Sequence, residues 1–310
     1  MKTYDERTMS ARGRVVLAGA SGLIGSALAG HLTAEGYEVV RLVRHVARDV
    51  SERSWDPARG ELDPVTLDRA DAVVHLGGES LARGRWNASR RRLLHDSRVT
   101  STALLARVIA TRKDRPAVFV SGSAVGIYGD RGETPLDETS APGRGFLAEL
   151  AVAWEAAAGP AARTGVRVVH PRLGVVLTPR GGALVPLLRA ARLGAGGPLG
   201  SGRQWWSWVT LDDAVRALAF AIARESIAGP CVVAAGSVRQ RELAAAIGRV
   251  LGRPAVLPAP AFALRLLLGG MADEMLLAGQ RVRPVVLERA GFRFHDPELE
   301  PALRAMLVRT

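Results

Sequence analysis

The sequence has little of what disulfide-bonded, secreted or membrane-spanning proteins need. Its 310 residues include one cysteine, Cys231, in the apolar run CVVAAG, so no internal disulfide bond can form. A lone cysteine in such a run fits a buried strand in a reducing compartment, and we expect a cytoplasmic protein. No stretch of about 18 uninterrupted apolar residues occurs, and the first twelve residues are charged, so we expect neither a membrane partner nor a signal peptide.

Lysine is nearly absent as well, since Lys2 and Lys113 are the only two and all other fixed positive charge is arginine. Almost no lysine is therefore available for catalysis. The histidines, at positions 31, 45, 75, 95, 170 and 295, show no metal-binding spacing, and no Cys/His pair exists for thiol catalysis. We expect no metal site.

The chain is strongly basic, with a formal net charge of +12. Clustered cations would indicate a nucleic-acid partner, because they neutralise phosphates and release counterions. Here the arginines are spread along the chain, and the only dense run is Arg90, Arg91 and Arg92. A net positive charge without clustering affects only solubility and nonspecific association. We therefore expect a small-molecule partner rather than nucleic acid.

Short β-branched runs alternate with longer amphipathic segments, which is the pattern of a parallel sheet covered by helices on both faces. The runs expected as strands are Arg14–Ala18, Glu38–Val43, Asp71–Leu76, Ala117–Ser121, Val166–His170 and Cys231–Ala235. Apolar residues at helical spacing predict helices at Leu23–Glu35, Arg90–Ala110, Phe146–Arg163 and Leu211–Ala223. Right-handed crossovers then give a Rossmann-type, doubly wound α/β sheet whose ligand crevice lies at the carboxyl ends of the strands.

The alternation weakens in the later part of the chain. Residues 178–208 are rich in glycine, proline and tryptophan, and the chain from residue 257 onward is mainly helical in pattern. We expect a flexible extension at 1–12, a Rossmann core at 13–177, a substrate-side segment with returning Rossmann elements at 178–256, and a small C-terminal domain at 257–310. The last of these would form a mainly helical cap on the substrate side.

The first predicted strand runs directly into a glycine-rich loop, after which a helix begins. Glycine permits the tight turn and lets backbone N–H groups approach a pyrophosphate, while the helix N-terminus favours negative charge. Three glycines can also form a purely structural turn, but the strand–loop–helix context is the one that a dinucleotide-binding fingerprint requires. The residues expected at the cofactor are Gly19, Ala20, Ser21, Gly22, Leu23, Ile24 and Gly25, together with Leu76, Gly77 and Gly78 after the third strand.

The residue at the end of the second strand distinguishes two cofactors. NAD-binding proteins usually place Asp or Glu there, about 20 residues past the loop, to bind the ribose 2′-hydroxyl. This chain has Arg44, whose guanidinium suits a 2′-phosphate by charge and by its forked donors. The alternative is a solvated strand end without a ligand. We expect NADP(H) to be favoured over NAD(H).

With these segments in view, the chain resembles the extended short-chain dehydrogenase/reductase superfamily and, within it, the epimerase family proteins of the SDR39U1/YfcH type. Beyond the glycine loop, the resemblance is carried by the segments DAVVHLGGESLA (71–82), GRW (84–86), DSRV (96–99), GIYG (126–129), GGPLGSGRQWW (196–206) and MLLAGQRVRP (275–284). It spans nearly the whole chain. It implies a domain like those of NAD-dependent epimerases and dehydratases, followed by a small C-terminal domain of unknown function.

Members of that superfamily typically use a serine, a tyrosine and a lysine four residues after the tyrosine. The lysine lowers the pKa of the tyrosine, which can then exchange a proton with the substrate oxygen. This chain contains no Tyr-x-x-x-Lys, and the corresponding positions, 146–147 and 150–151, are all apolar. Ser123 stands where the resemblance puts the serine, and Tyr128 in GIYG is either an acid or a pocket wall. Ser123 and Tyr128 are the candidate catalytic residues.

The substrate side is predicted from residues that follow strands and from one aromatic segment. Glu79 and Arg172 follow the third and fifth predicted strands, where a structural role is the alternative for each. The run GSGRQWWSW at 200–208 combines flexible glycines, a cation, an amide and large rings, which suits a pocket for a planar or anionic ligand. From this run we expect a substrate contact at Arg203, Gln204, Trp205 and Trp206, although core packing explains some of the tryptophans.

Two functions fit these features. The first is an NADP(H)-dependent oxidoreductase or epimerase-like enzyme that transfers hydride to or from an unidentified small molecule without the usual Tyr-x-x-x-Lys pair. The second is a catalytically silent NADP(H)-binding sensor or interaction protein, because that proton-transfer pair is missing. A homodimer is compatible with either.

Overall fold

All six runs expected as strands lie in one parallel sheet in the computed structural model of the chain, which describes residues 12–308. The strands are β1 (Arg14–Ala18), β2 (Glu38–Val43), β4 (Ala72–His75), β5 (Val118–Ser121), β8 (Arg167–Leu173) and β11 (Gly229–Val233). The short β3 (Glu52–Ser54) extends one edge, and β6 (Ser123–Ala124) pairs with β8. The order β11-β8-β5-β4-β1-β2-β3 reverses direction between β1 and β4, which confirms the Rossmann-type, doubly wound fold.

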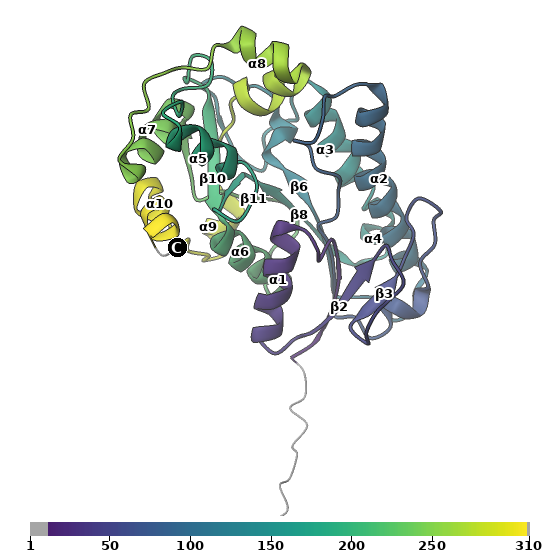
Figure 1. Cartoon of the computed structure of the whole chain (residues 1–310). Coiled ribbons are helices and arrows are strands. Elements are labelled where there is room, and N and C mark those ends of the chain that lie inside the picture. Colours follow the sequence, from purple (N-terminus) through teal and green to yellow (C-terminus); the bar gives the residue numbers. More distant parts are fainter. Residues whose placement is uncertain (1–11, 309–310) are drawn as a thin grey trace, which may run out of the picture.

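Helices cover both faces of this sheet (Figure 1). On one face, α1 (Leu23–Ala34) and α6 (Leu211–Ala223) pack together over the apolar side chains of β1, β4 and β11. On the other face, α2 (Ala88–Thr111) packs with α4 (Gly159–Ala162). The single helix expected at Phe146–Arg163 is divided into α3 (Phe146–Ala156) and α4, because Pro160 has no N–H with which to continue the helical hydrogen bonds.

The second half of the chain builds a cap with its own core beside the sheet. Its three-stranded sheet has the order β12 (Gly236–Arg239), β10 (Trp205–Thr210), β9 (Val175–Leu177). The helices α5 (Leu184–Arg192), α7 (Gln240–Leu251) and α10 (Leu299–Val308) surround its apolar core. The segment 178–208, where the alternation of the sequence pattern weakens, contains α5 and the start of β10.

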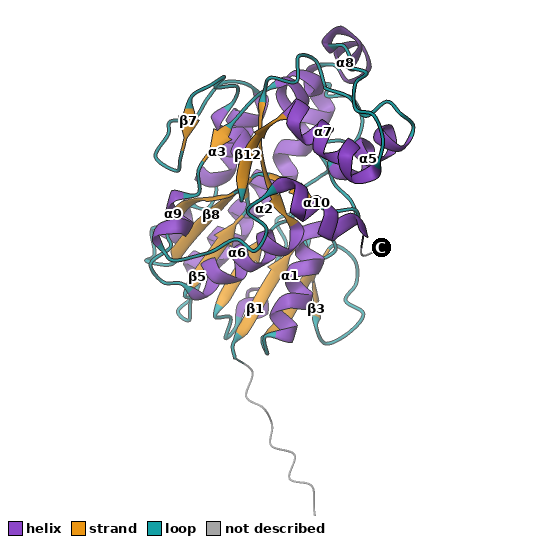
Figure 2. Ribbon diagram, turned by 90° about the vertical axis from the view of Figure 1, so that its left-hand side faces the viewer, coloured by secondary structure: helices purple, strands orange, loops and turns teal. Residues whose placement is uncertain are grey.

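The C-terminal segment crosses back from the cap to the Rossmann half. It contains α8 (Ala261–Leu268), the π-helix η3 (Ala272–Leu277), β13 (Arg281–Val282) and α9 (Val285–Arg289). Strand β13 pairs in parallel with β7 (Pro135–Leu136), which follows the 3-10 helix η2 (Val125–Tyr128). Figure 2 shows α8 at the outer end of the cap, away from the central sheet.

Two further expectations concern the N-terminal extension and membrane-spanning segments. The flexible extension expected at 1–12 lies outside the described residues except for Arg12, whose backbone N–H donates to Gly36 O and whose side chain pairs with Glu35 at 3.0 Å. No helix within residues 12–308 is long and apolar enough to cross a membrane. The 3-10 helix η1 (Pro64–Leu67) is the remaining element of the Rossmann half.

Candidate functional site

The glycine loop makes a turn that side chains would block. Gly19 has a φ of +86°, and a Cβ on it would lie 2.5 Å from the backbone nitrogen of Gly77. A Cβ on Gly25 would lie 2.1 Å from the carbonyl oxygen of Gly19. No side chain caps the N-terminus of α1, which begins directly after Gly22. The uncapped N-terminus at the end of β1 is therefore available to a phosphate group, as the sequence predicts.

The loop after β4 lies against the glycine loop and rests on a buried histidine. The N–H of Leu76 donates to Ala18 O at 2.9 Å, and the N–H of Gly77 to Nδ1 of His75 at 3.3 Å. Burial, with a smaller contribution from the Arg98 charge, lowers the pKa of His75 to about 3. His75 is thus a neutral structural residue beneath the predicted cofactor loop.

Arg98 is a buried structural residue beside the predicted cofactor loop, and it was not predicted from the sequence. Its buried guanidinium donates to Glu79 O at 2.9 Å and to Leu94 O at 3.1 Å. A Cβ on Gly78 would lie 2.9 Å from the Arg98 Cζ, so only glycine leaves room for the guanidinium there. Arg98 lies on the sheet-facing side of α2, and this charged residue at an apolar-facing helical position was the available signal.

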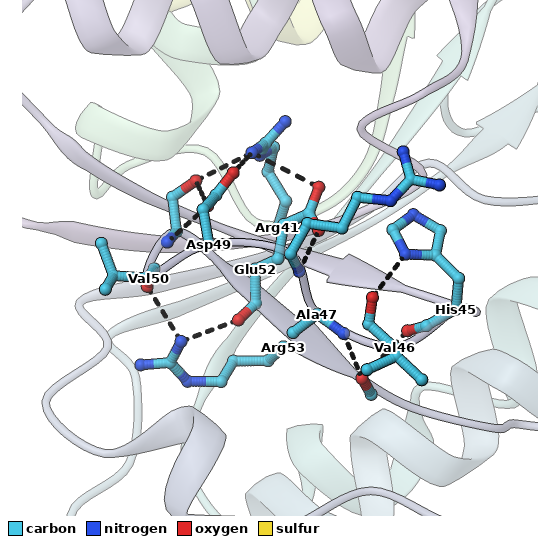
Figure 3. Close-up of polar contacts among 11 residues, drawn as sticks. Arg41, His45, Val46, Ala47, Asp49, Val50, Glu52 and Arg53 are labelled. Carbon is cyan, nitrogen blue, oxygen red and sulfur yellow. Dashed lines mark hydrogen bonds and ion pairs between the residues drawn. The ribbon is translucent and has the colours of Figure 1, made fainter.

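Arg44 directly follows β2. Figure 3 shows the hydrogen bonds that hold the turn after it, among residues that include Arg41, Asp49 and Glu52. Arg41 donates to Asp49 at 3.0 Å, and the N–H of Arg48 donates to Glu52 at 3.0 Å. The Ser51 hydroxyl hydrogen bond lowers the pKa of Asp49, which therefore stays ionised and holds the turn. The turn is braced, whereas the Arg44 side chain is 73% exposed, with a single ion pair among the described residues, to Glu79 at 3.9 Å.

Glu79, in the loop after β4, lies between the two cations Arg90 and Arg44. Its carboxylate is 3.5 Å from Arg90 Nη1 and 3.9 Å from Arg44 Nη1. Arg90 also donates to Ser80 O. The structure thus places Glu79 beside the predicted 2′-phosphate residue, and its role as a substrate contact stays a prediction.

Ser123 belongs to a buried network at the carboxyl ends of β5 and β8. Its hydroxyl donates to Glu155 Oε1 at 2.6 Å. Arg172 donates to both oxygens of Glu155, from Nε at 2.9 Å and from Nη2 at 2.9 Å. Arg172 is 5% exposed, so the structure assigns it to this ion pair rather than to an open pocket. Glu155 was not predicted from the sequence because it lies 32 residues beyond Ser123.

Tyr128 has a structural role rather than the predicted catalytic one. Its side chain is fully buried, and its hydroxyl donates to Asp137 O at 2.8 Å while accepting from Arg172 Nη1 at 2.9 Å. Burial raises the pKa of Tyr128 to about 12, although the hydrogen bond from Arg172 opposes the shift. A group that holds its proton so firmly, with both hydrogen bonds inside the protein, is a poor general acid.

The positions that usually carry the tyrosine and lysine are part of an apolar cluster. Leu150 packs with Trp86, Leu94 and Met271, and the side chains of Phe146 and Leu147 lie against them. The C-terminal segment closes this cluster through Glu274, whose carboxylate accepts from the N–H groups of Phe146 and Leu147 at 3.1 and 2.7 Å. The start of α3 is therefore capped by a side chain more than 120 residues away, and the residues at the predicted dyad positions pack against apolar neighbours.

The aromatic segment at 200–208, which enters β10 at Trp205, is divided between core and surface. Trp206 is buried in the cap core, so its predicted substrate contact is wrong. The side-chain amide of Gln204 is hydrogen-bonded within the protein, since its Nε2 donates to Leu199 O at 3.0 Å and to Leu276 O at 2.8 Å. The ring of Trp205 lies 4.1 Å from the Arg239 guanidinium, and Arg203 is exposed. Arg203 and Trp205 remain predicted substrate contacts.

One group of side chains in the described part of the chain has metal-ligand spacing, namely Asp212, Asp213 and His295. Asp213 is fully buried and already accepts from the backbone N–H groups of His295 and Asp296, each at 2.9 Å. Its Oδ1 also pairs with Arg216 at 2.5 Å. The oxygens of Asp213 thus hold the C-terminal segment against α6.

A parallel sheet with a glycine turn at its switch point defines a Rossmann-type, NAD(P)-binding fold. The chain belongs to the NAD dependent epimerase/dehydratase family, whose model matches residues 15–236. A domain of unknown function (DUF1731) matches residues 259–306. The resemblance inferred from the sequence motifs is confirmed.

Relatives and solved structures agree with this assignment. The chain is 44% identical over 290 residues to an epimerase family protein of Mycobacterium bovis, covering 93% of this chain and 96% of the relative. It is 35% identical over 300 residues to the human epimerase family protein SDR39U1, covering 95% and 100%. A crystal structure of human SDR39U1 with NADPH matches with a TM-score of 0.87 and 33% identity, covering 96% of this chain and 100% of that one.

Proposed function

We propose that this protein is an NADP(H)-dependent oxidoreductase or epimerase-like enzyme that acts by hydride transfer on a small molecule. The observation that carries the proposal is the glycine turn at the end of β1, where a Cβ on Gly19 or Gly25 would meet backbone atoms. This cradle fits the pyrophosphate of a dinucleotide, and Arg44 stands exposed at the end of the neighbouring strand. The human relative solved with NADPH supports the phosphorylated cofactor.

The choice between the two cofactors is tested at Arg44. We expect Arg44→Ala to weaken NADPH binding by roughly 10- to 100-fold, because a charge-assisted hydrogen-bonded contact contributes about 1.5–3 kcal/mol. NADH binding should stay unchanged, since NADH has no 2′-phosphate. Fluorescence titration of wild type and variant with both cofactors measures this. Arg48→Ala, on the same braced turn, is the matched control, and equal losses for NADPH and NADH would rule out the phosphate role.

We propose a proton path that does not use Tyr128 and that requires the substrate to reach the buried Ser123 hydroxyl. When bound, NADP(H) supplies or accepts the hydride. In the oxidation direction, the Ser123 oxygen takes the proton of a substrate hydroxyl while the Ser123 hydrogen passes to Glu155 Oε1, 2.6 Å away. Reduction runs the same transfers in reverse. Arg172 holds the Glu155 carboxylate through two hydrogen bonds and thereby positions it toward Ser123.

The hydride-transfer proposal is tested with a panel of carbonyl, imine, enone and nucleotide-sugar compounds. We expect at least one compound to change the absorbance of the reduced nicotinamide. For that compound, Ser123→Ala and Glu155→Gln should lower kcat by roughly 10²-fold or more, the usual range for losing acid–base assistance, with little change in NADPH affinity. Arg203→Ala should reduce turnover in the same way without loss of NADPH binding.

A second candidate function is a silent NADP(H)-binding sensor or interaction protein. The apolar cluster at the usual dyad positions favours it, because Phe146, Leu147 and Leu150 cannot exchange protons. Tight NADPH binding with no hydride exchange across the whole panel would select this function. In either case we propose a small-molecule ligand and a cytoplasmic location, which the buried Cys231 thiol fits because burial raises its pKa to about 12.

A further inference from the structure

The outer side of α8 is apolar and exposed. The structure buries none of the eight residues of this helix. Phe262, Leu266 and Leu267 are 72%, 74% and 68% exposed, and Phe262 and Leu266 share one face because they are four residues apart. Val256 and Leu257, just before the helix, are exposed as well. Single exposed apolar residues are ordinary, whereas a group of them marks a contact surface. We call Phe262, Leu266 and Leu267 the α8 patch.

The opposite side of the same region is firmly attached to the protein. Leu268 packs into the apolar cluster that contains Trp86 and Met271. Arg85 Nη2 donates to Leu266 O at 3.0 Å and thereby ties the last turn of α8 to the loop after β4. Figures 1 and 2 both show α8 at the outer end of the cap. The α8 patch is therefore a fixed, outward-facing surface.

Positive charge lies beside α8. Arg265 lies within the helix, Arg85 contacts its last turn, and Arg91 Nη2 lies where a Cβ on Gly270 would be 3.4 Å away. The charges of Arg265 and Asp273 cancel each other, so Arg85 and Arg91 provide the excess positive charge beside α8. Asp273 pairs with Arg265 at 2.8 Å, and Glu274 accepts from two backbone N–H groups at the start of α3. An apolar patch with positive charge beside it is complementary to an anionic surface that has an apolar interior.

We propose that the α8 patch docks onto an anionic membrane surface. The three apolar side chains enter the boundary between headgroups and acyl chains, and the neighbouring arginines bind lipid phosphates. A second copy of the chain fits this surface less well, because a two-fold interface would place the same arginines against each other. The sequence predicts no membrane partner because no segment can span a bilayer, but docking at the interface requires no spanning segment. The net charge of +12 also favours binding to an anionic surface.

The proposal is tested by flotation of the full chain with large unilamellar vesicles of phosphatidylcholine, with and without phosphatidylglycerol. We expect wild type to float with the anionic vesicles and to be released as salt is raised. The triple variant F262Q/L266Q/L267Q should bind more than about tenfold more weakly, since it loses the apolar insertion. R85Q/R91Q should lose the preference for anionic lipid. The matched control is V46Q/V50Q/V65Q, which changes three exposed apolar residues of the Rossmann half and should bind like wild type.

Several results would overturn the proposal. One is wild type that remains unbound with anionic vesicles, and another is a triple variant that floats as well as wild type. Light scattering without lipid adds a third, because a wild-type dimer that becomes a monomer in the triple variant would make α8 an interface between copies. Thermal melting near the wild-type temperature shows that the variants are folded. The outcome is independent of hydride transfer, because flotation requires neither cofactor nor substrate.

Discussion

We expect Gly25→Ala to abolish measurable NADPH binding under conditions in which wild type binds. The new Cβ would lie 2.1 Å from Gly19 O, 2.8 Å from Gly19 C and 3.1 Å from Ala20 Cα. These are backbone atoms, so the turn itself must open, and it would no longer present the N-terminus of α1 to the pyrophosphate. The loss should be about 100-fold or more in affinity, since strain of this kind costs about 1–3 kcal/mol even before binding contacts are lost.

Gly30→Ala is the matched control on the same helix. A Cβ on Gly30 would have no neighbour within 4 Å, so alanine there should leave NADPH affinity unchanged. It should raise the free energy of unfolding by about 1 kcal/mol, because alanine is the better helix former. Fluorescence titration and urea unfolding measure both effects. If Gly25→Ala bound NADPH as tightly as Gly30→Ala, the glycine loop could not be the pyrophosphate site.

The second large effect is expected at Asp213. We expect Asp213→Ala to lower the free energy of unfolding by about 3–5 kcal/mol, the usual cost of leaving one member of a buried pair uncompensated. The substitution removes the acceptor for the N–H groups of His295 and Asp296 and the partner of Arg216. Urea unfolding followed by circular dichroism measures the change.

Asp212, the preceding residue, provides the control. Its side chain is exposed, and its interaction with His295 is long, at 3.9 Å. Asp212→Ala should therefore cost less than about 1 kcal/mol, the range of a solvated charge near a helix N-terminus. Equal losses for the two variants would mean that the buried carboxylate does not hold the C-terminal segment against α6.

The parts of the fold that follow from local pattern were predictable. The bounds of β1, β2 and α6 match the predicted ranges because each combines a clear apolar period with an abrupt end. β3 and β6 were not predicted, since ERS and SA contain no apolar run. β10 was taken as a pocket wall because tryptophan serves both pockets and cores. The tryptophans Trp206 and Trp208 of β10 lie in a core rather than a pocket because α7 and α10, which come later in the chain, pack against them.

The candidate site was likewise predictable only where its residues are close together in the sequence. The glycine loop is contiguous, so the spacing of Gly19, Gly22 and Gly25 was sufficient to predict it. The network of Ser123, Glu155 and Arg172 joins three elements, and no spacing rule links a hydroxyl to a carboxylate one crossover away. Tyr128 was a reasonable candidate by residue type, but its burial depends on Arg172, Asp137 and the segment that contains β13.

The pairing of β13 with β7 has a consequence for the order in which the protein can be made. All strands of the central sheet have left the ribosome once residue 233 has emerged, so the half that contains the glycine turn can fold while synthesis continues. β7 must wait for Arg281–Val282, and Glu138, which accepts from the N–H groups of Val232 and Val286, must wait slightly longer. Biosynthesis therefore supplies the strands of the central sheet first, and the contacts that the C-terminal segment makes with β7 and α6 last.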